Sequence, residues 1–216
     1  MRTLLIFLLA FNASSKVLNF ETTRMKSTGG AGVASILMNE ATVTNPAPLA
    51  FFNMSALYFE KFSTERTLKD SEKSLEDSNF AIIASDSSKN LKGSIAYIKT
   101  KSGENSQKQL NLAFASTLGK KSAGGLTYRD VEKSYRYKGK VVKRKYKQMV
   151  PGVFHAVSNN FNIGFVAIDP LRKVPRESKI ILGTQWTIFN YVSLILDLGT
   201  DYKSDMQESS LVRGGS

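Results

Sequence analysis

The sequence contains no cysteine and only one histidine, His155, in 216 residues. A disulfide, a thiolate metal site and a cysteine nucleophile are therefore excluded, and a zinc site built from histidines is not expected. No apolar run reaches the roughly 18 residues that a transmembrane helix needs. A glycine-rich phosphate loop and a strand-borne acidic pair are also missing from the pattern. The sequence accordingly predicts no cofactor, no metal ion and no catalytic residue.

What the chain does contain is a period-2 alternation of apolar and polar residues, clearest between Asn160 and Asp201. The predicted strands 178–188 and 190–201 each carry large apolar side chains on one face: Leu182, Trp186, Leu194, Leu196 and Leu198. Tilted strands of about ten residues cross the hydrocarbon of a bilayer, whereas ordinary strands average five or six. The alternation therefore predicts membrane-spanning strands that point these side chains outward.

Ten such strands are predicted, at residues 54–63, 78–87, 91–101, 108–118, 121–130, 148–158, 160–170, 178–188, 190–201 and from 209 to the end. Long polar connections at 64–77, 102–107, 131–147, 171–177 and 202–208 alternate with tight turns near Ser88-Lys89, Gly119-Lys120, Asn159 and Phe189-Asn190. Outer-membrane barrels have this asymmetry of short periplasmic turns and long outside loops. The fold class expected is all-β, an antiparallel up-and-down transmembrane β-barrel.

The face opposite the apolar one is predicted to point inward. It carries polar residues: Lys92, Ser94, Asn111, Asn162, Gln185, Ser193 and Asp197. An unpaired charge facing lipid at mid-depth would cost roughly 2 to 4 kcal/mol. In hydrocarbon only a closed sheet pairs every backbone group of a strand, so closure into a cylinder is expected.

Residues 1–15 have the layout of a secretory signal. Arg2 precedes an apolar core from Leu4 to Phe11, and Ala13 and Ser15 occupy the small-residue positions before a cleavage site. The alternative is a buried amino-terminal strand or helix. A signal peptide and the absence of cysteine favour a bacterial envelope protein of the cell outer membrane.

The segment after it predicts a short helix and an extended exit. Gly29 and Gly30 allow backbone conformations that other residues rarely adopt. Residues 33–42 favour a short helix. The pairs Asn45-Pro46 and Ala47-Pro48 then favour extended backbone. This segment resembles the amino terminus of the FadL-like outer-membrane proteins, which include long-chain fatty-acid transporters and PorV-like secretion proteins. The residues that carry the resemblance are Gly29, Gly30, Ala31, Ala34, Ala41, Asn45, Pro46, Ala47, Leu49 and Ala50.

The resemblance implies that residues 16–51 form a hatch inside a barrel made by residues 52–216. Two positions depart from the family pattern: Pro48 replaces a glycine, and Asn39-Glu40 stands where an aspartate is common. A linker with one amphipathic turn is the alternative. Full-length members of the family have fourteen strands, so the chain is expected to be a fragment or a reduced barrel of ten.

By the same resemblance, the function expected is uptake or passage of hydrophobic small molecules. The apolar residues on the inward face, Ile98, Val166, Ile181 and Ile195, are the candidates for lining the lumen around such a ligand. They could equally pack against the hatch. The alternative function is that of a PorV-like docking protein for secreted partners. The strand number, the state of the lumen and the oligomer are left open by the sequence.

His155 and Ser158 raise the possibility of a barrel enzyme that acts on lipids. A pair on one face of a strand requires a spacing of two residues, whereas these residues are three apart and point to opposite faces. A structural histidine near the periplasmic rim is therefore favoured over catalysis.

The strongest charge feature is the basic, tyrosine-containing stretch from Arg129 to Lys147. Simple solvation, nucleic-acid binding and contact with lipopolysaccharide phosphates are the three interpretations. On an outside loop the last is favoured over nucleic acid, and the candidate contacts are Lys140, Lys143, Arg144, Lys145 and Lys147. Outer-membrane lipid and lipopolysaccharide are thus the partners expected.

Overall fold

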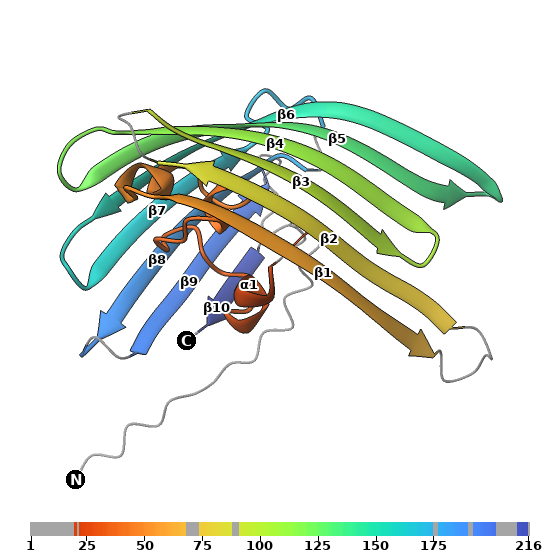
Figure 1. The fold of residues 1–216 in the computed structure, drawn as a ribbon, viewed down its shortest axis with the longest axis horizontal. Coiled ribbons are helices and arrows are strands. Elements are labelled where there is room, and N and C mark those ends of the chain that lie inside the picture. Colours follow the sequence, from red (N-terminus) through yellow and green to blue (C-terminus); the bar gives the residue numbers. More distant parts are fainter. Residues whose placement is uncertain are drawn as a thin grey trace, which may run out of the picture.

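The computed structural model describes residue 20 and residues 22–67, 74–87, 91–174, 177–189, 192–201 and 211–215. One sheet contains ten strands: β1 (Ser55–Thr67), β2 (Ser74–Asp86), β3 (Lys92–Ser102), β4 (Asn105–Thr117), β5 (Ser122–Tyr137), β6 (Lys140–Ala156), β7 (Phe161–Ile168), β8 (Lys179–Ile188), β9 (Val192–Asp201) and β10 (Leu211–Gly215). Each strand pairs antiparallel with the next one in the chain (Figure 1). The predicted all-β, up-and-down architecture is confirmed. The expected signal segment 1–15 lies outside the described residues.

Two connections predicted as long polar loops are instead tight turns. β3 ends at Ser102 and β4 begins at Asn105, while β5 ends at Tyr137 and β6 begins at Lys140. The turns use left-handed backbone at Gly103 (φ 56°) and at Gly139 (φ 79°). The loops expected at 102–107 and 131–147 are therefore wrong. Their polar residues continue the strand ladder, because opposite charges such as Glu132 and Lys145 are cross-strand partners.

The two faces of the sheet differ as the alternation predicts. Leu182, Trp186, Leu194 and Leu196 are between 42% and 55% exposed on the outer, convex face. Lys92, Ser94, Asn111 and Asp197 are buried on the opposite face. The assignment of large apolar side chains to the outside is thus confirmed.

Residues 22–52 lie against the concave face of the sheet, as Figure 1 shows. We call this segment the hatch. It contains a helix, α1 (Thr23–Ser27), and two 3-10 helices, η1 (Glu40–Thr42) and η2 (Ala47–Phe51). None of the helices in the described residues has the length and apolar character to cross a membrane.

The hatch lies where expected, but its local structure differs from the prediction. Turns rather than a helix run from residue 33 to residue 39, and η2 replaces the extended exit after Pro46. A proline at the start of a helix removes only an N–H group that has no intrahelical partner, so Pro46 and Pro48 fit the first turn of η2. The absence of a helix over residues 33–39 follows from contacts with the wall, described below.

The hydrophobic core lies between the hatch and the wall, in three clusters. The first joins Met38, Ala41, Ala47, Leu49 and Ala50 of the hatch to Ala115, Ala123 and Phe154. The second joins Phe20, Met25 and Val43 to Ala81, Ile83, Ala96 and Ile98. The third joins Val33 to Val150, Val166, Ile168 and Ile181. The hatch is therefore the packing partner of the inner face of the sheet.

The described sheet is curved but is not closed by strand pairing. β1 and β10 are its two edge strands, and the described residues include no ladder between them. The expected cylinder is therefore corrected to an open sheet in this part of the chain. The start of the hatch lies near both edges: Thr23 N donates to Glu60 Oε2 of β1 at 3.1 Å, and Gly29 lies against Gly214 of β10.

The β5–β6 turn gives a test of backbone strain alone. Gly139 has φ +79° and open space around the position of a Cβ atom, so Gly139→Ala introduces conformational strain without a clash. We expect the free energy of unfolding in detergent micelles to fall by about 1 kcal/mol, measured by urea titration. Gly93→Ala is the matched control, because Gly93 also has open space and has no positive φ. Equal effects of the two variants would contradict the assigned turn.

Candidate functional site

Four glycines on the inner face of the sheet bring the hatch backbone into contact with the wall. A Cβ atom on Gly125 of β5 would lie 2.8 Å from Ala47 N, and one on Gly152 of β6 would lie 2.1 Å from Asn45 Oδ1. A Cβ on Gly164 of β7 would lie 2.2 Å from Val33 O, and one on Gly183 of β8 would lie 2.8 Å from Ala34 N. We call Gly125, Gly152, Gly164 and Gly183 the glycine platform. Any side chain there would push the hatch away.

The register places these glycines side by side. Gly125 is the cross-strand partner of Gly152, and Gly164 is the partner of Gly183. Sequence reasoning missed the platform as a site, although the signal was present. Glycines at inward positions of four consecutive strands mark a place where another backbone approaches closely.

Asn45 uses its whole amide to hold the hatch. Its Nδ2 donates to Val33 O at 2.8 Å and to Val153 O of β6 at 3.0 Å, while its Oδ1 accepts from Ala47 N at 3.1 Å. The side chain is fully buried. Residues 45–47 of the resemblance thus lie together at the contact with the wall. Gly29 and Gly30 lie apart from them, at the end of α1, where both have positive φ.

Asp197 of β9 is the second polar anchor. Its Oδ2 accepts from Gly32 N at 2.9 Å and from Val33 N at 3.2 Å, and the side chain is 2% exposed. Hydrogen bonds to a carboxylate are about twice as strong as neutral ones. Asp197 and Asn45 together bind the backbone groups of Gly32 and Val33, which explains why a helix is not needed there.

A third group of donors reaches the hatch from β5. Arg129 donates from Nη2 to Val43 O at 2.6 Å, and Thr127 donates from Oγ1 to Thr42 O at 3.4 Å. Arg129 is buried, so this contact places a guanidinium group directly on a hatch carbonyl. Polar side chains of β5 and β9 therefore hold the hatch in addition to its apolar clusters.

The four apolar lumen candidates are all buried on the inner face. Ile98 packs in the cluster that includes Met25 and Val43 of the hatch, and Val166 and Ile181 pack in the cluster of Val33. Ile195 is 8% exposed. The structure thus brings three of them against the hatch, and their role in holding a ligand stays a prediction.

An open cavity of about 960 Å³ lies between α1 and the ends of β1–β5 on the side of the β3–β4 turn. We call it the vestibule. Most of the residues that line it are polar or charged and two are aromatic; besides the charged residues they include Asn79, Thr100, Ser102, Asn105, Ser106, Gln107, Phe62 and Tyr135. It also contains cations, of which Lys101, Lys133 and Arg136 pair with Glu76, Glu177 and Glu104. Its paired charges and amide groups suit a polar molecule better than an apolar one.

His155 has a partner that the sequence did not reveal. Its Nδ1 lies 2.8 Å from Ser122 Oγ, because the two residues are cross-strand partners on the outer face. Ser158 is not part of this pair. In the described residues no carboxylate hydrogen-bonds the imidazole, and such an orienting group is part of an activated serine. We therefore interpret Ser122 and His155 as a structural cross-strand contact near the β4–β5 turn.

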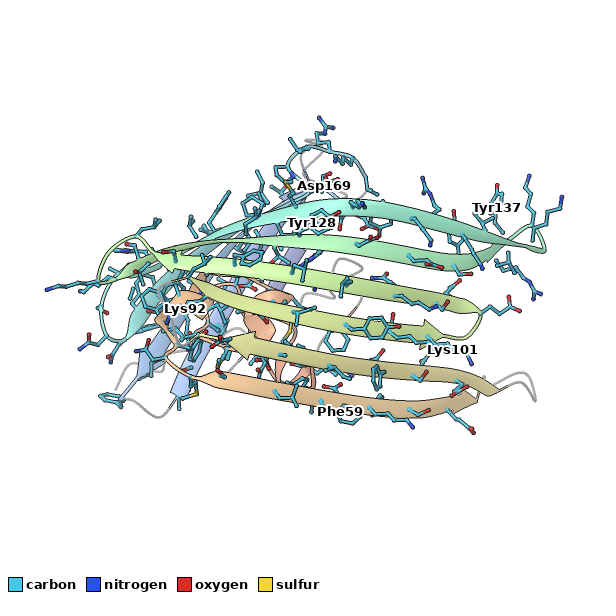
Figure 2. The ribbon with its side chains drawn as sticks, turned by 45° about the horizontal axis from the view of Figure 1, so that its top comes forward. Phe59, Lys92, Lys101, Tyr128, Tyr137 and Asp169 are labelled. Atoms are coloured by element: carbon cyan, nitrogen blue, oxygen red, sulfur yellow. The ribbon has the colours of Figure 1, made fainter. Side chains whose placement is uncertain are left out.

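The basic candidates for lipopolysaccharide contact do not share one loop. Lys143, Lys145 and Lys147 point to the outer face of β6, whereas Lys140 and Arg144 fall on the opposite face. All five are exposed, and Lys145 forms a 3.1 Å ion pair with Glu132. Figure 2 shows Tyr137 near the tip of this hairpin, beyond the main body of the sheet.

Comparison with known proteins finds no matching family model and no matching curated protein. Among solved structures, the chain is similar to a NanC porin at 9% sequence identity and a TM-score of 0.47, over 74% of this chain and 92% of that one. The distribution of side chains on the two faces of the sheet therefore carries the functional conclusion.

Substitutions in the glycine platform test how the hatch is held. Ser35 is buried in the hatch and the chain has no cysteine, so Ser35→Cys provides a single, nearly isosteric thiol as a reporter. Gly152→Ala puts a methyl group on Asn45 Oδ1. Because buried polar contacts are lost, we expect labelling of the thiol in the folded protein to be roughly tenfold faster. In the Gly93→Ala control the rate should not change, and an equal rate in both backgrounds would contradict docking at Gly152.

Proposed function

We propose that the chain is an integral β-barrel protein of the bacterial outer membrane. The observation that carries the proposal is the exposure of large apolar side chains on the outer face of β1 through β9. They include Leu57, Phe59, Ile82, Ile95, Tyr97, Leu110, Phe114, Leu126, Met149, Val153, Phe165, Leu182, Trp186, Leu194, Leu196 and Leu198. A soluble protein rarely exposes a contiguous apolar surface of this extent. Hydrocarbon is the environment that such a face fits.

The height of the apolar surface supports the same proposal. On the outward face of β4, Leu110, Leu112 and Phe114 are apolar and Leu118 follows directly after the strand, while Lys108 and Lys120 lie on either side of this run. Ten residues of a strand tilted by about 40° rise roughly 25 Å, which is the height of the apolar band of outer-membrane barrels.

The hatch supports the finer proposal of a FadL-like protein that passes hydrophobic small molecules. The concave face is filled where the resemblance implies a hatch, and Asn45, Pro46 and Ala47 lie at its contact with the wall. In this proposal an apolar molecule reaches Ile98, Val166 and Ile181 only after the hatch moves, because these side chains now pack against it.

A second candidate is a PorV-like docking protein, in which the hatch stays in place and the outer end of the sheet binds a secreted partner. The polar, ion-paired lining of the vestibule favours this candidate. The candidate is also favoured by the several side chains that hold the hatch in place, namely Asn45, Asp197, Arg129 and Thr127.

A charge placed on the outer face tests the membrane assignment. Leu196→Arg puts a cation midway along β9, and we expect it to lower the folding stability in bilayers by roughly 2 to 4 kcal/mol. The readout is the fraction of heat-modifiable protein after folding into vesicles across a urea series. Val141→Arg is the control, because Val141 is 64% exposed on the outer face near the tip of the β5–β6 hairpin. If both variants fold as well as wild type, the outer face does not contact hydrocarbon.

Loosening the hatch separates the two candidates. If the protein passes hydrophobic molecules, Asn45→Ala should raise the uptake of a fluorescent long-chain fatty acid into proteoliposomes several-fold, because the buried amide contacts that hold the hatch are lost. Gly93→Ala should leave uptake at the wild-type level. If wild type and Asn45→Ala both stay at the rate of empty liposomes, uptake is excluded and the docking candidate remains.

A further inference from the structure

The register of the sheet places two lysines side by side on the outer face. Lys99 of β3 is the direct cross-strand partner of Lys108 of β4, and both side chains are exposed. Like charges in directly opposite positions destabilise a sheet. In the part of the chain that the structure describes, neither lysine forms a salt bridge with a carboxylate. The arrangement leaves a place for an anion between them.

More lysines continue this row across the neighbouring strands. Lys61 of β1 and Lys99 are both partners of Phe80 on β2, and Lys108 and Lys145 are both partners of Glu132 on β5. Glu132 forms an ion pair with Lys145 at 3.1 Å and also attracts Lys108 without a salt bridge, so Lys61 and Lys99, with Lys108 beside them, are the cations that a ligand can reach. Strands are about 4.8 Å apart, so Lys61 lies roughly 10 Å from Lys99 along the row.

Aromatic residues place this row at the edge of the apolar surface. Phe59, Phe80 and Tyr97 stack edge to face on the outer side, with centroid distances of 5.6 Å and 6.3 Å. Such girdles lie at the level of the lipid headgroups. Figure 2 labels Phe59 on β1 and Lys101 near the end of β3.

A groove over β2, β3 and β4 lies deeper in the apolar surface. It has an open volume of about 440 Å³ and is lined mainly by apolar residues, among them Ile95, Leu112 and Phe114. Gly93 forms part of it, and nothing lies within 4 Å of the position of its missing Cβ atom. The six residues from Lys99 to Gly93 span about 20 Å of strand, or roughly 15 Å of depth at a 40° tilt. That depth equals about half the hydrocarbon thickness, the length available to one acyl chain.

We propose that the outer face of β3 and β4 binds one lipopolysaccharide molecule, with a phosphate held by Lys99 and Lys108 and an acyl chain running to the groove at Gly93. The inference rests on the proposed function, and it takes as the outside of the cell the end of the sheet where β5 and β6 extend furthest and where the long connection 169–178 joins β7 to β8. Lys61, about 10 Å along the row, fits a headgroup that carries more than one phosphate better than it fits a phospholipid with a single one. The site differs from the five basic candidates on the β5–β6 hairpin, of which only Lys145 belongs to the row.

The test measures lipopolysaccharide binding by purified protein in neutral detergent, after heat-modifiability has shown that each variant is folded. With Lys99→Gln and Lys108→Gln combined, we expect binding to weaken about 30-fold. Lys120→Gln combined with Lys121→Gln is the control, since it removes the same charge from exposed lysines at the β4–β5 turn. Equal losses in the two double variants, or no loss in the first, would overturn the proposal.

A separate variant tests whether the acyl chain occupies the groove at Gly93. Gly93→Leu fills it while all lysines remain, so affinity for lipopolysaccharide should fall several-fold, whereas affinity for a deacylated phosphorylated headgroup should not change. An unchanged affinity for the complete lipid would remove the acyl chain from the groove.

Two further ligands identify the source of the phosphate. Phosphatidylglycerol vesicles should bind more weakly than lipopolysaccharide, and inorganic phosphate should not displace it. Equal affinity for phosphatidylglycerol, or full displacement by phosphate, contradicts the assignment. Heat-modifiable wild type that binds no lipopolysaccharide overturns this inference alone. Protein that is not heat-modifiable overturns the proposed function and this inference with it.

Discussion

Contact between the hatch backbone and the glycine platform is the constraint on which the rest of the structure depends. Where the hatch meets Gly164 and Gly183, residues 33–39 form turns rather than a helix, and Asn45 and Asp197 bind the backbone groups of Gly32 and Val33. The inner face accordingly combines glycine and alanine under the hatch with polar anchors around it. The exposed large apolar side chains lie on the outer face, where the proposed hydrocarbon environment would cover them.

This division of residues bears on what can pass through the protein. The apolar surface suited to a hydrophobic molecule lies under the hatch, whereas the open vestibule has a polar lining. A hydrophobic ligand therefore needs the hatch to move, and the hydrogen bonds of Asn45, Asp197 and Arg129 set the free energy of that movement. A docking protein needs the same bonds to persist. The strength of the hatch contacts thus separates the two functions.

Sequence periodicity predicted the strands well because membrane strands repeat one local rule, and Leu182 to Leu198 follow it closely. It failed at residues 131–147, because beyond the apolar surface both faces of a hairpin are polar and resemble a loop. It also failed inside the hatch, where the partner of Gly32 is Asp197, 165 residues away. The pairs Ser122–His155 and Lys99–Lys108 depend on register, which alternation within a single strand does not contain.

Register also changes which cations matter for a membrane partner. The hairpin from Arg129 to Lys147 is the densest in charge, but Lys140 lies five residues beyond Lys145, or about 17 Å further along the strand. That exceeds the Debye length of about 8 Å at physiological ionic strength, so Lys140 interacts weakly with phosphates at the level of Lys145. Lys99 and Lys108, from two strands of ordinary composition, lie directly above Tyr97 and Leu110 at the edge of the apolar surface. In the proposed lipopolysaccharide site, height relative to the lipid headgroups, rather than charge density along the sequence, therefore selects the lysines.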